Sequence, residues 1–203
     1  MRYKAKKFVS LTVCLKELEP FVKNGEHLQT GRGFKSFNGM RSREVLANWL
    51  LCVVQNFVNE KDRFTFSSDS TGGDGIIIDQ DAGLAWPTEH VMVPRSRKTE
   101  TLMPDAIISK IRQKIEKGGA AYASGKTLVV FLNDSGKWYT NKVAAQLPVP
   151  LHFDTVWVVN LMGVKDEEYV YGVTNLYLAG GDVPVFLVKI EKTFDRWEVA
   201  RVQ

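Results

Sequence analysis

Apolar residues along the chain recur at the spacing of helices in some stretches and at the two-residue spacing of strands in others. A helix is predicted from Ser42 to about Glu60, where the apolar stripe consists of Leu46, Trp49, Leu50, Val53 and Phe57. Ser42 is a suitable cap for this helix, and Glu44 is favourable in its first turn. Glu44 falls on the arc opposite the stripe, so the pattern predicts that it faces solvent.

The middle of the chain alternates predicted strands with a second helix. Residues 63–67 alternate as a strand, and residues 74–93 read as a hairpin whose first strand is apolar on both faces, as in a covered sheet. A helix should begin near Pro104 and end at Gly118-Gly119. Further strands are predicted at 126–133, 153–159, 169–177, 183–190 and 196–202, with a short helix within 138–146.

The N-terminal part is less regular. Residues 5–15 fit a strand or a short buried segment, and Glu19-Pro20 marks a turn. Residues 31–43 hold three glycines, four cations and two phenylalanines without periodicity. This stretch fits a mobile basic loop that contacts nucleic acid and, equally well, a linker whose phenylalanines pack into the core.

These elements predict an α/β or α+β domain with a mixed central sheet flanked by helices. With 203 residues, 44% of them hydrophobic, the chain fits one domain with a substantial core. Within it we distinguish a basic N-terminal arm and loop (1–43), a core (42–160) and C-terminal strands (169–203). The sequence leaves open whether the C-terminal strands extend the main sheet or form a separate layer.

The predicted hairpin carries two carboxylates. Asp74 is expected to open its first strand and Glu89 its second, so that both side chains can converge on one cation. Mg²⁺ or Mn²⁺ needs only one or two carboxylates when waters and a substrate phosphate complete its coordination. Asp74 and Glu89 are therefore candidate metal ligands, although residues at strand ends are also commonly polar for structural reasons alone.

The order of helix, strand, Asp-Gly-Ile-Ile-Ile-Asp, Glu-bearing strand, helix and Leu-Val-Val-Phe-Leu resembles the core of the PD-(D/E)xK nuclease superfamily, the restriction-endonuclease-like fold. By that resemblance, Asp74 matches the metal-binding aspartate, Glu89 the first residue of the (D/E)xK element, and Glu44 a glutamate of the first helix. The lysine of the motif is missing, because Val91 stands at its position. Members of the superfamily place catalytic residues on other elements, which makes Lys110 a candidate, with Lys114 and Lys98 as alternatives.

The resemblance implies a metal-dependent endonuclease that hydrolyses phosphodiesters with Mg²⁺ or Mn²⁺. The alternative is a catalytically inactive module of the same fold that binds nucleic acid or a protein partner, which the missing lysine favours. Two unrelated motifs are weaker. Residues 118–127 resemble a phosphate-binding P-loop, but Ala120 replaces its first glycine and the helix precedes the strand. The three histidines are too far apart to suggest a metal site.

Charge is distributed unevenly. Residues 1–43 contain ten basic and three acidic residues, although the whole chain carries only +4. Such asymmetry suits contact with a polyanion. The candidates for nucleic-acid binding, with DNA favoured over RNA, are Arg32, Lys35, Arg95, Arg97 and Lys98. A protein partner and a homodimer both remain open.

Cys14 and Cys52 lie in apolar segments without metal-ligand spacing, so we expect two reduced core thiols. The basic and apolar N-terminus ends at Lys16 and Glu17, too early for a signal peptide or a membrane span. The sequence therefore predicts a cytoplasmic protein.

Overall fold

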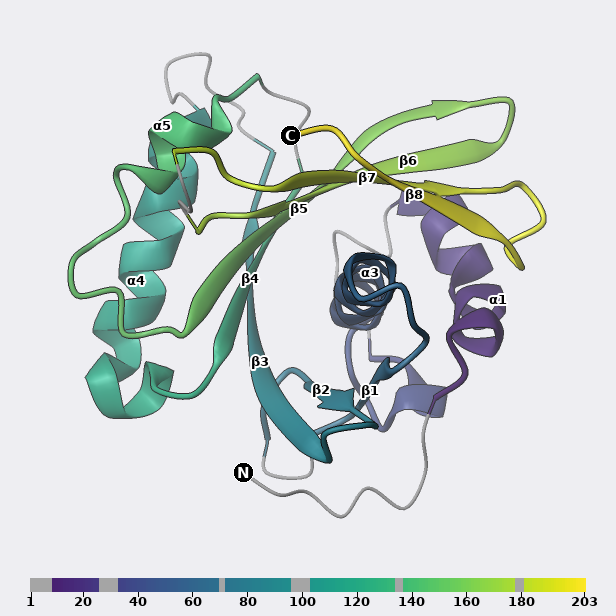
Figure 1. Cartoon of the computed structure of the whole chain (residues 1–203), viewed down its shortest axis with the longest axis horizontal. Helices are drawn as coiled ribbons and strands as arrows, with labels where there is room; N and C mark the ends of the chain where they lie inside the picture. Colours follow the sequence, from purple (N-terminus) through teal and green to yellow (C-terminus); the bar gives the residue numbers. More distant parts are fainter. Residues whose placement is uncertain (1–8, 26–32, 70–71, 96–102, 134–136, 178–180) are drawn as a thin grey trace.

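The computed structural model describes residues 9–25, 33–69, 72–95, 103–133, 137–177 and 181–203. Within these residues, eight strands form one mixed sheet in which each strand lies beside its neighbours in sequence. The sheet curls strongly into a half-barrel, and helix α3 (Ser42–Val58) runs through its concave side (Figure 1). The predicted α/β class and mixed central sheet are confirmed at this level.

Pairing within the sheet changes from antiparallel to parallel and back. The first three strands form an antiparallel meander, the third to fifth are parallel, and the fifth to eighth are antiparallel. The strands are β1 (Phe64–Ser67), β2 (Ile76–Asp79), β3 (Leu84–Val93), β4 (Thr127–Leu132), β5 (Thr155–Lys165), β6 (Glu168–Asn175), β7 (Val185–Ile190) and β8 (Trp197–Arg201). The C-terminal strands thus extend the main sheet.

Each parallel connection crosses the convex face through a helix, as parallel pairing requires. Helix α4 (Met103–Ala123) connects β3 to β4, and α5 (Thr140–Ala144) connects β4 to β5 (Figure 1). Alternate residues of β4 therefore face two cores. Val129 and Phe131 pack on the α3 side, whereas Leu128 and Val130 pack with α4.

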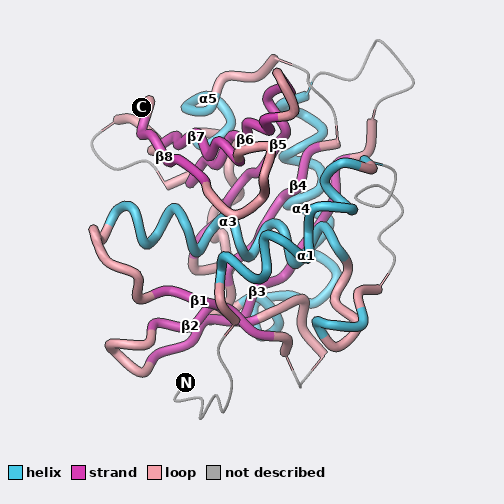
Figure 2. The backbone as a smooth tube through the Cα atoms, turned by 90° about the vertical axis from the view of Figure 1, so that its right-hand side faces the viewer, coloured by secondary structure: helices cyan, strands magenta, loops and turns pink. Residues whose placement is uncertain are grey.

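Helix α1 (Leu11–Lys23) occupies part of the segment that was expected to be a strand or a short buried stretch: the strand was wrong for the described part, whereas Cys14 and Leu15 are buried. Ser10 caps the helix, and Pro20 lies inside it instead of marking a turn. Its buried residues are spaced by three and four, namely Cys14, Leu15, Leu18 and Val22. They pack in the same core as α3, and Figure 2 shows both helices between the β1–β2 and β6–β8 parts of the sheet.

The burial of α3 corrects the prediction that Glu44 faces solvent. Every residue from Ser42 to Val54 is buried, because the curled sheet surrounds one side of the helix and α1 covers another. Glu44 is only 6% exposed. Its carboxylate accepts a hydrogen bond of 2.8 Å from the main-chain N–H of Arg41, which is the N-cap in place of Ser42.

The predicted basic loop between residues 31 and 43 is structured where it is described. A 3₁₀ turn, η1 (Lys35–Phe37), follows Phe34, and the rings of Phe34 and Phe37 are both buried in the α3 core. These rings lie 4.9 Å apart, centroid to centroid. The phenylalanines therefore anchor the segment in the core, as the second interpretation of this stretch held.

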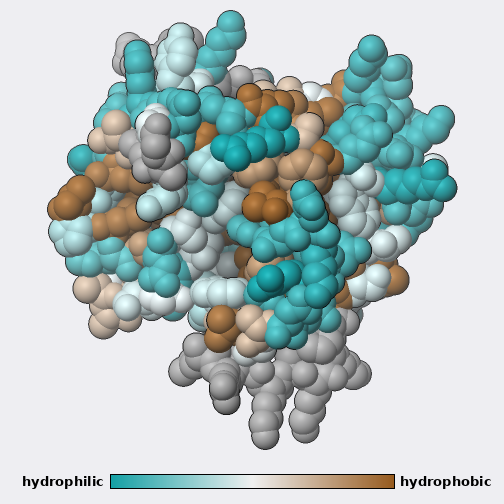
Figure 3. Space-filling view, viewed as in Figure 1, coloured by the Kyte–Doolittle hydropathy of each residue, from teal (hydrophilic) through white to brown (hydrophobic). Residues whose placement is uncertain are grey.

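Hydrophilic residues cover much of the surface seen in Figure 3, with apolar patches between them. Among the described helices, none combines the length and apolar character needed to cross a bilayer.

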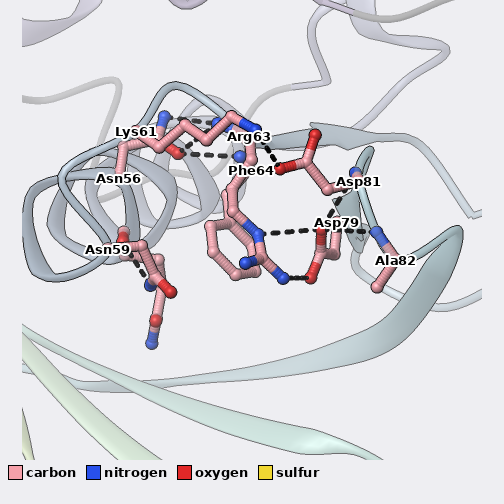
Figure 4. A network of polar contacts seen from close by, with 9 residues as sticks. Asn56, Asn59, Lys61, Arg63, Phe64, Asp79, Asp81 and Ala82 are labelled. Carbon is pink, nitrogen blue, oxygen red and sulfur yellow. Dashed lines mark hydrogen bonds and ion pairs between the residues drawn. The ribbon is translucent and has the colours of Figure 1, made fainter.

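A buried amide on α3 anchors the first strand. Figure 4 shows Asn56 pointing toward the main chain of Arg63 and Phe64. Its Oδ1 accepts from both main-chain N–H groups, at 3.0 and 2.7 Å, and its Nδ2 donates to the carbonyl of Phe64 at 3.1 Å. The Arg63 guanidinium, in turn, forms two hydrogen bonds with the carboxylate of Asp79 at the end of β2. Asn56 thus joins α3 to the meander.

We predict that Asn56→Ala lowers the free energy of unfolding by about 2 kcal/mol, because three main-chain groups of Arg63 and Phe64 lose their buried partner. Asn59→Ala is the matched control: Asn59 lies one turn later, is exposed, and donates only to Gln55 of its own helix. This control should change stability by no more than about 0.5 kcal/mol. Urea denaturation of both variants tests the prediction, and equal effects would contradict it.

Candidate active site at the end of the hairpin

The candidate site lies just before the start of β2, beside the middle of β3. The two residues before β2 also run alongside β3. The N–H of Asp74 donates to the carbonyl of Thr88 at 3.2 Å, and the N–H of Thr88 donates to the carbonyl of Gly75 at 2.8 Å. Asp74 consequently lies beside Glu89. The two residues lie opposite each other, although Asp74 precedes β2 and Glu89 stands in the middle of β3 instead of at its start. Their convergence on one cation stays a prediction.

The second strand is longer than predicted because the turn lies earlier. Residues 84–86 pair with residues 77–79, which leaves a short turn in which Gly83 has a φ of +62°. Positive φ is readily adopted by glycine and strained for other residues.

A cavity of about 760 Å³ opens beside Asp74. Its described lining comes from the segment before α3, the start of α3, the loop before β2, strand β3 and helix α4. The charged or ionisable residues among them are Arg41, Glu44, Asp69, Asp74, His90, Lys114 and Lys117. The cavity is thus polar, and carboxylates as well as cations border it.

Asp74 is held by the main chain of β3. Its Oδ2 accepts a hydrogen bond of 2.7 Å from the N–H of His90. Burial raises the pKa of Asp74, and the nearby charge of Glu89 adds to the rise, which together outweigh that hydrogen bond. Burial likewise raises the pKa of Glu44, with a contribution from the charge of Asp74. Two carboxylates with raised pKa values therefore border one cavity.

Glu89 has a different environment, because cations surround its carboxylate. Lys126 Nζ lies 2.9 Å from Oε1, Lys114 Nζ lies 3.0 Å from Oε2, and the Tyr122 hydroxyl also donates to Oε2. Burial acts to raise the pKa of Glu89, but the hydrogen bonds from Lys126, Tyr122 and Lys114 outweigh it, so the pKa lies below its ordinary value. Glu89 is ionised in a nearly enclosed site, where its side chain is 8% exposed.

Lys114, and not Lys110, reaches the carboxylates. Lys110 donates to Gln113 on its own helix at 3.0 Å, whereas Lys114, one turn later, lines the cavity and contacts Glu89. Burial acts to lower the pKa of Lys114, but its hydrogen bond and charge interaction with Glu89 raise it overall, so the ammonium stays protonated. Glu44, Asp74, Glu89 and Lys114 are thus brought to one place.

Sequence reasoning missed Tyr122 and Lys126 as parts of this site. The first part of α4 ends at the Gly118-Gly119 pair, as expected, because Gly119 has a non-helical φ of +65°, and a further helical turn to Ala123 follows this kink. A Cβ atom at Gly118 would lie 2.4 Å from Tyr122, so the glycine permits the close approach of that ring. The Gly-Lys-Thr sequence at 125–127 was the one sequence feature that pointed to this part of the site. Its Lys126 pairs with Glu89, and its Thr127 begins β4.

The predicted nucleic-acid contacts fall in different places. Lys35 and Arg95 are exposed, on η1 and directly after β3 respectively, and neither lines the cavity. Arg32, Arg97 and Lys98 lie outside the described residues. Among the described cations, Arg41, Lys114 and Lys117 do border the cavity.

The donor set suits a hard divalent cation held by few protein ligands. Asp74 and Glu89 supply carboxylate oxygens, and a cation beside Asp74 would stabilise the ionised carboxylate that burial and the charge of Glu89 disfavour. The described residues contain no cluster of three or more histidine, cysteine, aspartate or glutamate side chains arranged to bind a metal. Water and substrate oxygens would therefore complete the coordination.

Comparison with known proteins identifies no relative: the chain matches no family model, no curated protein and no solved structure. The geometry of the site is therefore the basis for assigning a function.

We predict that Lys114→Met raises the pKa of Glu89, because the carboxylate loses a cation and a hydrogen bond while it remains buried. Lys110→Met is the matched control on the same helix and should leave that pKa unchanged. A pH titration of the Glu89 carboxyl carbon by NMR measures both variants. An unchanged Glu89 pKa in Lys114→Met would contradict the ion pair.

Proposed function

We propose that the protein is a metal-dependent nuclease of the PD-(D/E)xK type, in which Asp74 and Glu89 bind Mg²⁺ or Mn²⁺. The observation that carries this proposal is the meeting of three groups from separate elements. Asp74 and Glu89 lie side by side on the hairpin, and the ammonium of Lys114 arrives from α4, 3.0 Å from Glu89. Lys114 supplies the cation that the sequence lacks at Val91.

The order and pairing of the elements support the same proposal. Helix α3, the antiparallel strands β1, β2 and β3, helix α4 and the parallel strand β4 follow each other as the sequence resemblance implies. Asp74 and Lys114 line the cavity, and Glu89 lies behind Lys114, 3.0 Å from its ammonium. A substrate phosphate can approach Asp74 and Lys114 through the cavity.

Each residue has a role in the proposed hydrolysis. The metal, when bound, would orient and help to deprotonate the attacking water and neutralise charge on the phosphodiester. Asp74 and Glu89 hold it, and Lys114 stabilises the negative charge that develops on the phosphate oxygens. One P–O bond forms to the water oxygen while the bond to the leaving sugar oxygen breaks, and that oxygen takes up a proton.

The rim of the cavity supports nucleic acid as the substrate. Arg41 and Lys117 border the cavity and can pair with phosphates that flank the scissile one. DNA is the first substrate to test and RNA the second.

One observation favours the second candidate, a non-catalytic module of the same fold that binds nucleic acid or a protein partner. Lys114, Lys126 and Tyr122 already satisfy the Glu89 carboxylate without a metal. In that case the four residues would form a buried polar cluster that stabilises the fold.

We predict Mn²⁺-dependent cleavage of DNA that EDTA abolishes. Asp74→Asn, Glu89→Gln and Lys114→Met should each lower the rate by roughly 100-fold or more, because each removes charge at the reacting phosphate or its metal. Calorimetric titration with Mn²⁺ should show saturable binding that is lost in Asp74→Asn. Gel-based cleavage of plasmid, single-stranded DNA and RNA gives the rates.

Asp81→Asn is the matched control. Asp81 is an exposed carboxylate on the turn of the same hairpin, where it pairs with Lys61 at 2.7 Å. This variant should cleave at the wild-type rate. A folded wild-type protein that binds nucleic acid, yet neither binds Mn²⁺ nor cleaves, would reject the nuclease and support the non-catalytic module.

A further inference from the structure

One fully buried amide on α3 contacts three residues of the candidate site. Asn48 Nδ2 donates to the carbonyl of Asp74 at 3.2 Å. Its Oδ1 accepts from the Thr88 hydroxyl at 3.0 Å and lies 3.3 Å from His90 Nε2. Asn48 has no exposed surface, and burying an amide is unfavourable unless its polar atoms are paired. Its position therefore depends on the strands that carry the site.

The chemistry of these partners fixes the orientation of the amide. The carbonyl of Asp74 can only accept a hydrogen bond, so Asn48 must present its NH₂ group to it. The oxygen of the amide then faces Thr88 and His90, and because that oxygen can only accept, the proton of the imidazole lies on Nε2. Asn48 thus sets both the position of the Asp74 main chain and the tautomer of His90.

His90 completes the link to the carboxylate. Its main-chain N–H donates to Asp74 Oδ2 at 2.7 Å, while its ring contacts Asn48. Asp74 is consequently held at its carbonyl by Asn48, at its N–H by Thr88 and at its carboxylate by His90. Two of these three neighbours are themselves bonded to Asn48.

The close approach of the amide requires glycine at position 75. A Cβ atom there would lie 2.3 Å from Asn48 Nδ2 and 3.1 Å from the Thr88 hydroxyl. Gly75 also has a φ of +145°, which other residues rarely adopt. The chain therefore has a residue without a side chain at the one point where α3 meets the start of the hairpin.

We propose that Asn48 is the positioning residue of this site, which holds Asp74 in place opposite Glu89 so that its carboxylate can serve as a metal ligand. Asn48 touches neither the metal nor the substrate in this scheme and acts through Asp74, Thr88 and His90. The inference rests on the proposed function for the metal. The geometry of Asp74 can be tested without it.

The test compares Asn48→Leu with Asn56→Leu, which removes the other buried amide of α3 that bonds to a strand. Both variants lose a paired amide and are destabilised, so both are studied where denaturation shows them to be folded. Hydrogen exchange is the readout that needs no metal. The amide protons of Asp74 and His90, whose acceptors belong to Thr88 and Asp74, should lose protection in Asn48→Leu and keep it in Asn56→Leu.

Nitrogen NMR of the His90 ring gives a second reading of the same contact. The wild type and Asn56→Leu should show the Nε2–H tautomer, and Asn48→Leu should show a mixture. Unchanged protection and an unchanged tautomer in Asn48→Leu would overturn the positioning role, whatever the protein does with metals.

The metal arm uses Mn²⁺ alone. We expect Asn48→Leu to bind Mn²⁺ about 10- to 100-fold more weakly than the wild type, as is typical when a residue that orients a metal ligand is removed. Asn56→Leu should retain the wild-type affinity. Wild-type affinity in Asn48→Leu would overturn the proposal, whereas absence of both Mn²⁺ binding and cleavage in the wild type would reject the nuclease and leave hydrogen exchange to decide the role of Asn48.

Gly75→Ala provides an independent route, because it displaces the Asn48 amide without changing its chemistry. Gly83→Ala is its control: Gly83 also has a positive φ, but nothing lies within 4 Å of a Cβ atom built there. The two variants share a backbone cost, and only Gly75→Ala should reproduce the loss of Asp74 and His90 protection. Equal behaviour of both glycine variants would count against the proposal.

Discussion

The enclosure of α3 by the curled sheet is the constraint on which the rest of the structure depends. A helix that is buried from Ser42 to Val54 cannot leave its polar side chains in water, so each of them needs a partner in the surrounding elements. Asn56 meets β1, Asn48 meets the start of the hairpin, and Glu44 closes the N-terminus of the helix. The polar residues of α3 therefore set the positions of the strands around it.

This constraint explains why the carboxylates lie where they do. The meander is pinned to α3 at two points eight residues apart, Asn48 and Asn56, and between them β2 and β3 pair in regular register. Beyond Asn48, β2 no longer pairs with β3, and β3 continues between β4 and the end of the cavity, with α4 packed beside it. Asp74 is held at that point, where a buried carboxylate can still be reached through a cavity. Asp74 is thus largely buried and yet borders an open cavity, a setting in which the pKa of a carboxyl group is commonly shifted.

Much of the fold could be predicted from the sequence, because local patterns determine the hairpin, the apolar stripe of α3 and the covered strand β4. The pairing of Asp74 with Glu89 also followed from the hairpin. The exposure of Glu44 was predicted wrongly, because a helical wheel assumes that one face of the helix is in contact with solvent. Helix α3 has almost no exposed face between Ser42 and Val54. Helix α1 was missed because Pro20 suggested a turn, while its burial against α3 depends on residues far along the chain.

The cations of the site show the same limit. Lys110 and Lys114 are one turn apart on α4, and periodicity alone cannot decide which of them reaches β3. That choice depends on where α4 crosses the sheet, which the buried Ile107 and Ile111 fix through tertiary packing. The positions of Tyr122 and Lys126 depend on the kink at Gly119 and on the turn at Gly125. In the sequence, each of these glycines is equally consistent with the simple end of a helix or loop.

The balance of charge at Glu89 connects the two functional interpretations. Its carboxylate faces two ammonium groups, whereas Asp74 has a main-chain N–H as its hydrogen-bond donor among the described residues. The site is therefore asymmetric, with one carboxylate compensated and the other destabilised in its ionised form by burial and repulsion. Under the proposed function, a divalent cation would gain most at Asp74, and Lys114 would supply positive charge to a phosphate in the cavity. Asp74 borders the cavity with a carboxylate that burial disfavours in its ionised form and that the hydrogen bond from His90 compensates only in part.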